Sequence, residues 1–371
     1  MKTKMQQLAD LGQSIWLDYI QRSLIKSGEL EHYVQTGLRG MTSNPAIFEK
    51  AIAETEDYNQ TIHILASQGK TTQEIYENLV IEDIRSAADT LRSVFDQTEG
   101  KDGYISLEVN PHLAHDSQAT IREAQRLFKT VGRPNLMIKV PATAEGMPAI
   151  RELIAEGINV NVTLIFSLEQ YKHVTAAYLS GLEQRLAKAG NIDQIASVAS
   201  FFVSRIDVKV DGLLNEIGTP NVLALRGKLG IAYAKNIYQS FKETFNGPRW
   251  DALSGKGARI QRVLYGSTST KDPNYSDVMY VENLIGAQTV NTVPPKTLSA
   301  FLDHGKVAVT LDKNVALAYD QLYQAEKLGI HMDEVTRQLL DEGIEKFNKP
   351  YDHLLATIAK TKDNLIAVYD R

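Results

Sequence analysis

Hydrophobic positions recur along this chain in two patterns, one typical of strands and one typical of helices. Short apolar runs rich in β-branched residues alternate with longer segments in which apolar residues return every three to five positions, as between 75 and 94. This alternation predicts parallel strands joined by helices, and eight strands predict a (β/α)8 TIM barrel. The eight predicted strands are Ser14–Ile20, Leu38–Asn44, Tyr104–Val109, Leu136–Thr143, Asn159–Ser167, Ala196–Arg205, Arg262–Thr268 and Thr289–Pro294.

The same pattern predicts one domain over residues 1–371, with additional helices. The barrel core should cover about residues 12–312, and residues 313–371 carry a helical pattern with no later strand, so we expect a helical C-terminal extension packed on the barrel. Residues 45–97, between the second and third strands, should hold more than one helix. An open, doubly wound sheet is the alternative, but no glycine-rich dinucleotide fingerprint follows the first strand.

Four of the predicted strands place polar residues on the face that should point to the barrel axis. Residues of equal parity share a face of a strand, and Asn161 and Thr163 alternate there with apolar neighbours. Asp18, Glu108 and Lys139 stand late in three other strands, near the carboxyl end where barrel enzymes build their active sites. Polar caps at a wetted rim, or a buried salt-bridge network, are the structural alternatives.

A lysine and two carboxylates on one barrel axis suit carbon–carbon bond chemistry. A desolvated lysine is a good amine nucleophile, and it condenses with a carbonyl to give an iminium that stores electrons when a neighbouring bond breaks. A carboxylate such as Asp18 can take the proton from the hydroxyl that becomes the leaving aldehyde. Forming and hydrolysing the Schiff base also moves protons through water, which suits Glu108 together with the Thr163 hydroxyl.

Charge and composition exclude several other classes of protein. The chain has 40 basic and 45 acidic residues, a formal net charge of -5, so the basic excess of a nucleic-acid-binding protein is absent. It has no cysteine, which excludes disulfides and thiolate metal sites. No run of about 18 apolar residues occurs, and the N-terminal segment lacks a signal-peptide pattern. We therefore expect a soluble, cytoplasmic protein that binds neither nucleic acid nor membrane.

Four motifs resemble those of the transaldolases, the class I aldolases of the pentose phosphate pathway. They are GMTSNPAIFEKAI, NLMIKVPAT, GINVNVTLIFSLEQY and ASFFVSRID. The likeness runs from about Gly12 to Pro294, and the chain length with the YGSTSTKDPNYSD segment is similar to the longer bacterial branch. The resemblance implies transfer of a dihydroxyacetone unit between sugar phosphates, with no cofactor and no metal.

The resemblance also implies roles for particular residues. Lys139 would form the Schiff base, Asp18 would be the general acid and base for bond cleavage, and Glu108 with Thr163 would handle the relayed water. The residues that would hold the sugar or its phosphate are Asn44, Asn161, Ser200, Phe202 and Arg205.

The phosphate end of the expected pocket raises two questions. Arg205 has the opposite parity to Ser200 and Phe202, so it can reach the pocket only if it lies beyond the end of its strand. Shorter family members place a second phosphate arginine after the seventh strand, where this chain offers Lys271 with Ser267 and Ser269 as donors. A lysine can bind phosphate as a point charge, so Lys271 is the candidate.

Two other functions stay open from the sequence. A class I aldolase that cleaves fructose 6-phosphate outright would use the same residues, since only the fate of the enamine differs. A metal-dependent barrel hydrolase or isomerase could use His112 and His115 with Asp116, although two such histidines are more often surface or capping residues. The sequence allows a homo-oligomer but does not specify one.

Overall fold

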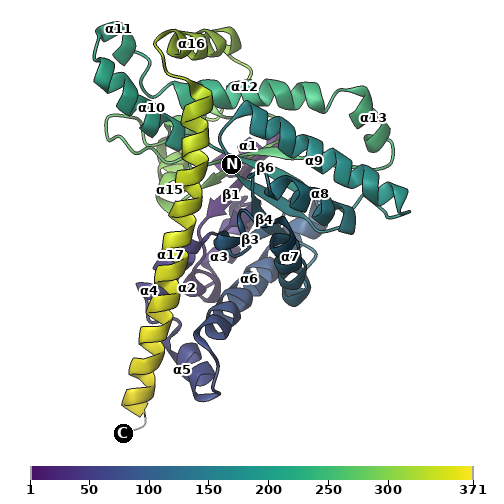
Figure 1. The fold of residues 1–371 in the computed structure, drawn as a ribbon, viewed down its shortest axis with the longest axis vertical. Coiled ribbons are helices and arrows are strands. Elements are labelled where there is room, and N and C mark those ends of the chain that lie inside the picture. The colour runs from purple at the N-terminus through teal and green to yellow at the C-terminus, as the bar shows by residue number, and fades with distance from the viewer. Residues whose placement is uncertain (1, 370–371) are drawn as a thin grey trace.

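The computed structural model describes residues 2–369 and contains a closed barrel of eight parallel strands (Figure 1). Each strand pairs with its sequence neighbours, and β1 closes the barrel by pairing with β8. The predicted (β/α)8 fold is confirmed. The strands are β1 (Gln13–Asp18), β2 (Gly40–Thr42), β3 (Tyr104–Glu108), β4 (Leu136–Pro141), β5 (Val160–Ile165), β6 (Ser197–Phe202), β7 (Arg262–Gly266) and β8 (Thr289–Val293).

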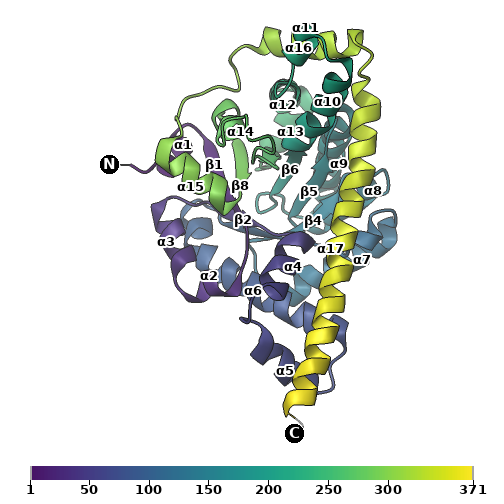
Figure 2. The ribbon, with the colours of Figure 1, turned by 90° about the vertical axis from the view of Figure 1, so that its left-hand side faces the viewer.

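Helices connect successive strands and cover the outside of the barrel, and others extend beyond it (Figures 1 and 2). Within the described residues, no helix is long and apolar enough to cross a membrane. The helices are α1 (Lys4–Asp10), α2 (Arg22–Lys26), α3 (Glu29–Thr36), α4 (Pro45–Ala53), α5 (Asn59–Ser67), α6 (Thr72–Gln97), η1 (Pro111–Leu113), α7 (Ser117–Val131), α8 (Gly146–Glu156), α9 (Leu168–Ala187), α10 (Ser204–Ile217), α11 (Pro220–Leu223), α12 (Leu229–Thr244), α13 (Pro248–Ser254), α14 (Met279–Asn283), α15 (Pro295–His304), α16 (Val315–Lys327) and α17 (Met332–Tyr369).

The middle of the barrel is filled by one layer of apolar side chains, which we call the apolar layer. It consists of Trp16, Tyr104, Met137, Val198, Leu264 and Val290, all buried. The indole of Trp16 fits because its register partner on β2 is Gly40, where an added Cβ would lie 2.6 Å from the ring. The apolar layer separates two polar ends of the barrel: a carboxyl mouth, where the strands end, and an amino mouth, where they begin.

Helix α17 is 38 residues long and runs along the length of the molecule in both views (Figures 1 and 2). It contacts α4, α5, α6 and α10 as well as β5. Side-chain contacts fix it at two points: Glu342 forms an ion pair with Lys209 of α10 at 2.5 Å, and Asp352 Oδ1 lies 2.7 Å from His112 Nε2. Between these two points lies Phe347, which is buried against the carboxyl mouth. The C-terminal helix therefore forms part of the wall of the site.

Candidate active site

A cavity of about 470 Å³ opens at the carboxyl mouth of the barrel. We call it the carboxyl-mouth cavity. Five cationic side chains and one carboxylate are among the residues that line it, so it has a strong positive charge. Of the ten residues predicted from the sequence, seven line this cavity: Asp18, Asn44, Lys139, Ser200, Phe202, Arg205 and Lys271.

Lys139 and Glu108 form a buried pair at the base of this cavity. They are register partners on β4 and β3, so their side chains leave the sheet side by side. The Lys139 Nζ donates to Glu108 Oε2 at 3.3 Å and to the Ser43 carbonyl oxygen at 3.1 Å, and both charged side chains are 5% exposed. Burial raises the pKa of Glu108, although the Lys139 charge opposes this effect. The raised pKa makes Glu108 a better proton acceptor than an exposed carboxylate.

Asp18 ends β1 beside two threonines that sequence reasoning did not identify. Its Oδ1 accepts from Thr42 Oγ1 at 2.7 Å, and Thr42 Oγ1 lies 2.9 Å from Thr292 Oγ1. Burial raises the pKa of Asp18, and the Lys139 charge is the main effect in the other direction. A carboxylate that is desolvated in this way and lines a cavity is suited to exchange a proton with a ligand.

Asn161 lies deeper than the sequence predicted and does not line the carboxyl-mouth cavity. Its Nδ2 donates to Ser106 Oγ at 2.9 Å, and its Oδ1 accepts from Ser200 Oγ at 2.6 Å. Ser200, which does line the cavity, keeps its lone pairs available for a ligand hydroxyl. Asn161 is the Cα partner of Lys139, so this hydrogen-bonded row packs directly beside the lysine.

Thr163 also lies deeper than predicted, because the backbone of β5 is irregular at this point. The register of β5 with β6 shifts between Val162 and Ile165, and Leu164 takes a positive φ of 59°. This bulge interrupts the strict alternation of side chains. Thr163 is fully buried, does not line the cavity, and its Oγ1 has no hydrogen-bond partner within the described residues.

Arg205 reaches the cavity because it lies beyond the end of its strand. Strand β6 ends at Phe202, and Arg205 occupies the first turn of α10. Its guanidinium packs against the Phe202 ring at 5.1 Å, and its buried Nη1 has no hydrogen-bond partner among residues 2–369. Burial lowers the pKa of Arg205, while the charges of Glu108 and Asp18 oppose this. A desolvated guanidinium with an unused donor is prepared for an anion.

Lys271 lies on the loop after β7, which is anchored to the helix that carries Arg205. The Lys271 Nζ donates to Ser269 Oγ at 2.5 Å, and burial followed by the Arg205 charge lowers its pKa. Tyr275 of the same loop donates to the buried Asp211 of α10 at 2.6 Å. Further along, Tyr280 donates to Asp207 at 2.8 Å, and burial raises the pKa of Asp207 to about 6.

Three further residues of the wall were not found from the sequence. Lys50 of α4 and Lys296 of α15 add positive charge, and Phe347 of α17 covers the base, with its ring 5.4 Å from Lys139 Nζ. One signal could have identified Lys296. It is the third residue after β8, just as Arg205 is the third after β6, so both lie in the first turn of the next helix.

Asn44 has a structural function in addition to its place in the cavity wall. It is the N-cap of α4, and its Oδ1 accepts from the Ile47 backbone N–H at 3.0 Å. This leaves its Nδ2 as the group that can meet a ligand.

The residues that suggested a metal-dependent enzyme have separate partners. His112 pairs with Asp352 at 2.7 Å, His115 lies 3.2 Å from Glu145, and Asp116 caps α7. Across the part of the chain that the structure describes, no group of three or more His, Cys, Asp or Glu side chains could hold a metal ion.

Comparison with known proteins gives a consistent result over nearly the whole chain. The family model described as Transaldolase/Fructose-6-phosphate aldolase matches residues 15–358. The chain is 48% identical to Transaldolase 2 of Nostoc sp. (strain PCC 7120) over 365 residues, which cover 95% of this chain and 96% of the relative. It is 48% identical to the Transaldolase of Trichodesmium erythraeum over 373 residues, 98% of each chain. It is 46% identical to Transaldolase 1 of Streptomyces coelicolor, with 97% and 95% covered.

Proposed function

Because the chain belongs to the transaldolase/fructose-6-phosphate aldolase family, we propose that it is a transaldolase of the pentose phosphate pathway. The enzyme transfers a dihydroxyacetone unit from sedoheptulose 7-phosphate or fructose 6-phosphate to glyceraldehyde 3-phosphate or erythrose 4-phosphate. The observation that carries this proposal is the buried pair of Lys139 and Glu108 at the base of a cavity lined by four further cations.

The first step is attack of the Lys139 amine on the ketose carbonyl. Glu108, 3.3 Å away, takes the ammonium proton that must leave before the nitrogen can attack. The carbinolamine then loses its hydroxyl as water, and a protonated carboxyl group supplies the proton for that departure. Glu108 also borders a small cavity of about 20 Å³, enough for one water molecule. Glu108 therefore serves both formation and hydrolysis of the Schiff base.

Asp18 breaks and remakes the carbon–carbon bond. Its carboxylate takes the proton from the C4 hydroxyl, the C3–C4 bond breaks, and its electron pair moves into the iminium to give an enamine on Lys139. The aldose leaves and another aldehyde enters. The enamine carbon attacks this aldehyde, and Asp18 returns the proton to the new hydroxyl. The Thr42 hydrogen bond at 2.7 Å holds the carboxylate in place for both directions.

Arg205 and Lys271 bind the phosphate group. The unpaired Arg205 Nη1 can donate to a phosphate oxygen, and Lys271 adds a point charge beside Ser269. Both side chains belong to the same rigid unit, because Tyr275 ties the Lys271 loop to α10. The distance between the phosphate site and Lys139 is thereby fixed, which orients the ketose.

The hydroxyls of the dihydroxyacetone unit meet Asn44 and Ser200. The Asn44 Nδ2 donates, and the Ser200 lone pairs accept, while Asn161 holds the Ser200 hydroxyl in one orientation through the 2.6 Å hydrogen bond. Thr163, two residues after Asn161 on β5, supports the water step with its buried Oγ1, which has no hydrogen-bond partner within residues 2–369.

Reductive trapping tests the covalent step. The protein is treated with borohydride in the presence of fructose 6-phosphate and then digested. The masses of its peptides are measured by mass spectrometry. We expect a dihydroxyacetone-sized adduct on Lys139, no adduct in Lys139→Met, and an adduct in Lys296→Met, which removes a different cation of the same cavity. An adduct on any other lysine in the wild-type protein would overturn the assignment.

Steady-state kinetics separate transfer from simple cleavage. The named relatives are transaldolases, which favours transfer over the aldolase reaction. Consumption of fructose 6-phosphate should depend strongly on erythrose 4-phosphate. Comparable turnover without the acceptor, with release of free dihydroxyacetone, would instead mark an aldolase.

Sugar phosphates are the partners of this enzyme, and we place it in the cytoplasm. Phosphorylated sugars are charged and stay on the side of the membrane where they are made, so an enzyme that consumes them works there. Self-association stays a prediction, which small-angle scattering on the full chain would measure.

A further inference from the structure

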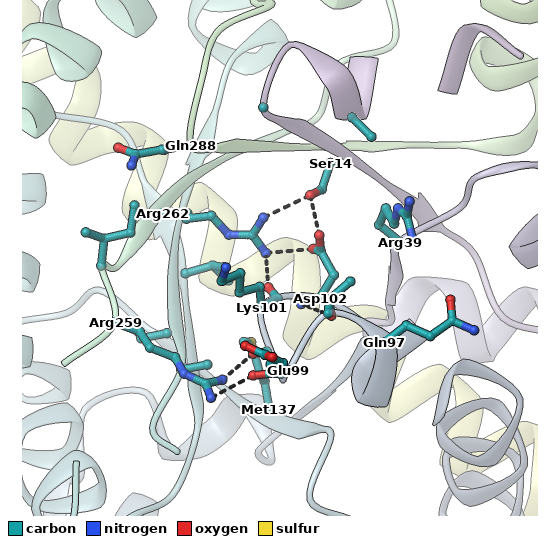
Figure 3. A pocket seen from close by; sticks show the side chains of 18 of the residues that line it. Ser14, Arg39, Gln97, Glu99, Lys101, Asp102, Met137, Arg259, Arg262 and Gln288 are labelled. Atoms are coloured by element: carbon teal, nitrogen blue, oxygen red, sulfur yellow. Dashed lines mark hydrogen bonds and ion pairs between the residues drawn. The ribbon is translucent and has the colours of Figure 1, made fainter. Parts of the chain in front are cut away.

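A second and larger cavity, of about 800 Å³, opens at the amino mouth of the barrel (Figure 3). We call it the amino-mouth cavity. Met137, Ala196 and Val198 contribute apolar surface to it, and four cations, Arg39, Lys101, Arg259 and Arg262, line it as well. Its size lies within the range of small-molecule sites. The proposed reaction uses none of these residues.

Two of these cations are fixed by the protein itself. Arg262 donates to Ser14 Oγ at 2.9 Å, to Asp102 Oδ1 at 2.8 Å and to the Lys101 carbonyl oxygen at 2.7 Å, as Figure 3 shows. Arg259 donates to the carbonyl oxygens of Gly100 and Glu99. Their donors are therefore largely committed to the protein, but their charges still act on the cavity.

The side chains of the other two cations, Arg39 and Lys101, are not hydrogen-bonded in this way. Neither the Arg39 guanidinium nor the Lys101 ammonium has a hydrogen-bond or ion-pair partner within residues 2–369, and no dashed line reaches the Arg39 side chain in Figure 3. Two carboxylates line the same cavity, against four cations. Asp102 is already bound to Arg262 and Ser14, and the exposed Glu99 carboxylate pairs with none of the four cations within the described residues. The cavity therefore keeps an excess of positive charge.

We propose that the amino-mouth cavity binds a small molecule that carries at least two negative charges. Arg39 would contact the anionic group through its planar fork and Lys101 as a point charge, while Arg259 and Arg262 add long-range attraction. The body of the ligand would lie on Met137 and Val198, and Gln288 could donate from the rim. Phosphate esters and dicarboxylates share this chemistry, and separate probes distinguish them.

The amino-mouth cavity is distinct from the proposed active site but close to it. The apolar layer lies between them: Leu264 lines the carboxyl-mouth cavity, and Met137 and Val198 line the amino-mouth cavity. Met137 and Lys139 are two residues apart on the same face of β4. The two cavities are therefore separate sites, and ligand binding can be measured at each of them.

Isothermal titration of the full chain with inorganic pyrophosphate, and separately with succinate, tests the proposal. We expect pyrophosphate to bind at the amino mouth, and the Arg39→Gln/Lys101→Gln variant to bind it at least about tenfold more weakly. Since neither side chain makes a hydrogen bond of its own, this variant should fold normally, as its thermal melt would show. The matched control, Arg122→Gln/Lys129→Gln, removes the same charge from two exposed positions on α7 and should change the affinity less than twofold.

The Arg205→Gln variant separates the two mouths. Pyrophosphate should bind more weakly at the phosphate site in this variant, and its affinity for the amino mouth should equal that of the wild type. Tighter binding of succinate than of pyrophosphate would assign the cavity to dicarboxylates. The proposal is overturned if neither anion binds at millimolar concentration, if the double variant binds like the wild type, or if Arg205→Gln abolishes all anion binding. None of these outcomes depends on whether Lys139 forms a Schiff base.

Discussion

The two mouths of the barrel each hold an arginine and a carboxylate, but the protein uses the two arginines differently. At the amino mouth, Arg262 donates to a serine, a carboxylate and a carbonyl oxygen, all from within the chain. At the carboxyl mouth, Arg205 packs against Phe202 and leaves Nη1 without a partner in the described structure. A buried donor without a partner costs free energy. We therefore infer that Arg262 stabilises the fold and that Arg205 binds a ligand.

The carboxylates at the two mouths, Asp102 and Asp18, also differ in how fully the protein pairs them. Asp102 accepts hydrogen bonds from Arg262 and Ser14, so its charge is neutralised where it stands. Asp18 accepts only from Thr42 among the described residues, and burial raises its pKa. A paired charge serves stability, whereas a desolvated and weakly paired charge is available for chemistry. Four substitutions test this contrast.

The largest effect should come from Asp18→Asn. It removes the base for C3–C4 cleavage, so we expect kcat to fall by about 10³, within the range for loss of a general base. The Schiff base with fructose 6-phosphate should still form, and borohydride should still trap it on Lys139. Loss of trapping together with loss of turnover would show that Asp18 acts earlier than proposed.

The wild-type pH profile tests the same carboxylates. Burial raises the pKa of both Asp18 and Glu108, and both must be ionised to accept a proton. Activity should therefore rise as the pH rises through these raised values, so the acid limb of kcat/KM should lie above the usual pH range of a carboxylate. An acid limb near pH 4, the value of an exposed carboxyl group, would contradict the burial argument.

Arg205→Gln should give the second largest effect. Loss of a charge-assisted contact to phosphate should lower kcat/KM for fructose 6-phosphate by about 100-fold. Unphosphorylated fructose lacks the group that Arg205 binds, so its kcat/KM should change little. The ratio of kcat/KM for the two substrates is therefore the measurement. The free energy of unfolding should stay within about 1 kcal/mol of the wild type, because the guanidinium makes no hydrogen bond within the described residues. An equal loss for both substrates would argue against a phosphate role.

Arg262→Gln should show the opposite behaviour. The Arg262 and Asp102 side chains are only 15% and 12% exposed, so breaking their pair leaves a poorly solvated carboxylate. We expect a loss of about 2 kcal/mol in the free energy of unfolding, measured by urea denaturation, because the pair is partly rather than fully buried. At a temperature where the variant is folded, the ratio of fructose 6-phosphate to fructose activity should equal that of the wild type. A changed ratio would mean that the two mouths are not separate.

The sequence predicted the barrel and the reactive end of the site for a physical reason. Side chains alternate strictly along a strand, so polar residues at even or odd positions identify the axial face, and this placed Lys139, Glu108 and Asp18. The prediction failed where side chains no longer alternate between the two faces of a strand. The bulge at Leu164 displaced Thr163, and Lys296 lies in a helix rather than in a strand.

Phe347 could not have been predicted from any local pattern. It is one apolar residue on the buried face of a long amphipathic helix, and only the path of α17 across the barrel brings it to Lys139. Long-range placement of this kind depends on tertiary packing, which the periodicity of a helix does not specify. The amino-mouth cavity was missed for a similar reason, since its cations come from three separate segments, at the starts of β2, β3 and β7.

The smallest effect should come from Tyr275→Phe, which sharpens the contrast within the phosphate site itself. Arg205 is held by its own helix, whereas Lys271 depends on a loop that Tyr275 ties to Asp211 at 2.6 Å. Without the hydroxyl, Lys271 is less well positioned, and KM for fructose 6-phosphate should rise about threefold with kcat unchanged. A double-mutant cycle with Lys271→Gln separates positioning from a general loss of stability. If Tyr275 acts through Lys271, the tyrosine substitution should have no further effect once the lysine is gone, and the exposed Tyr323→Phe should have none in either background.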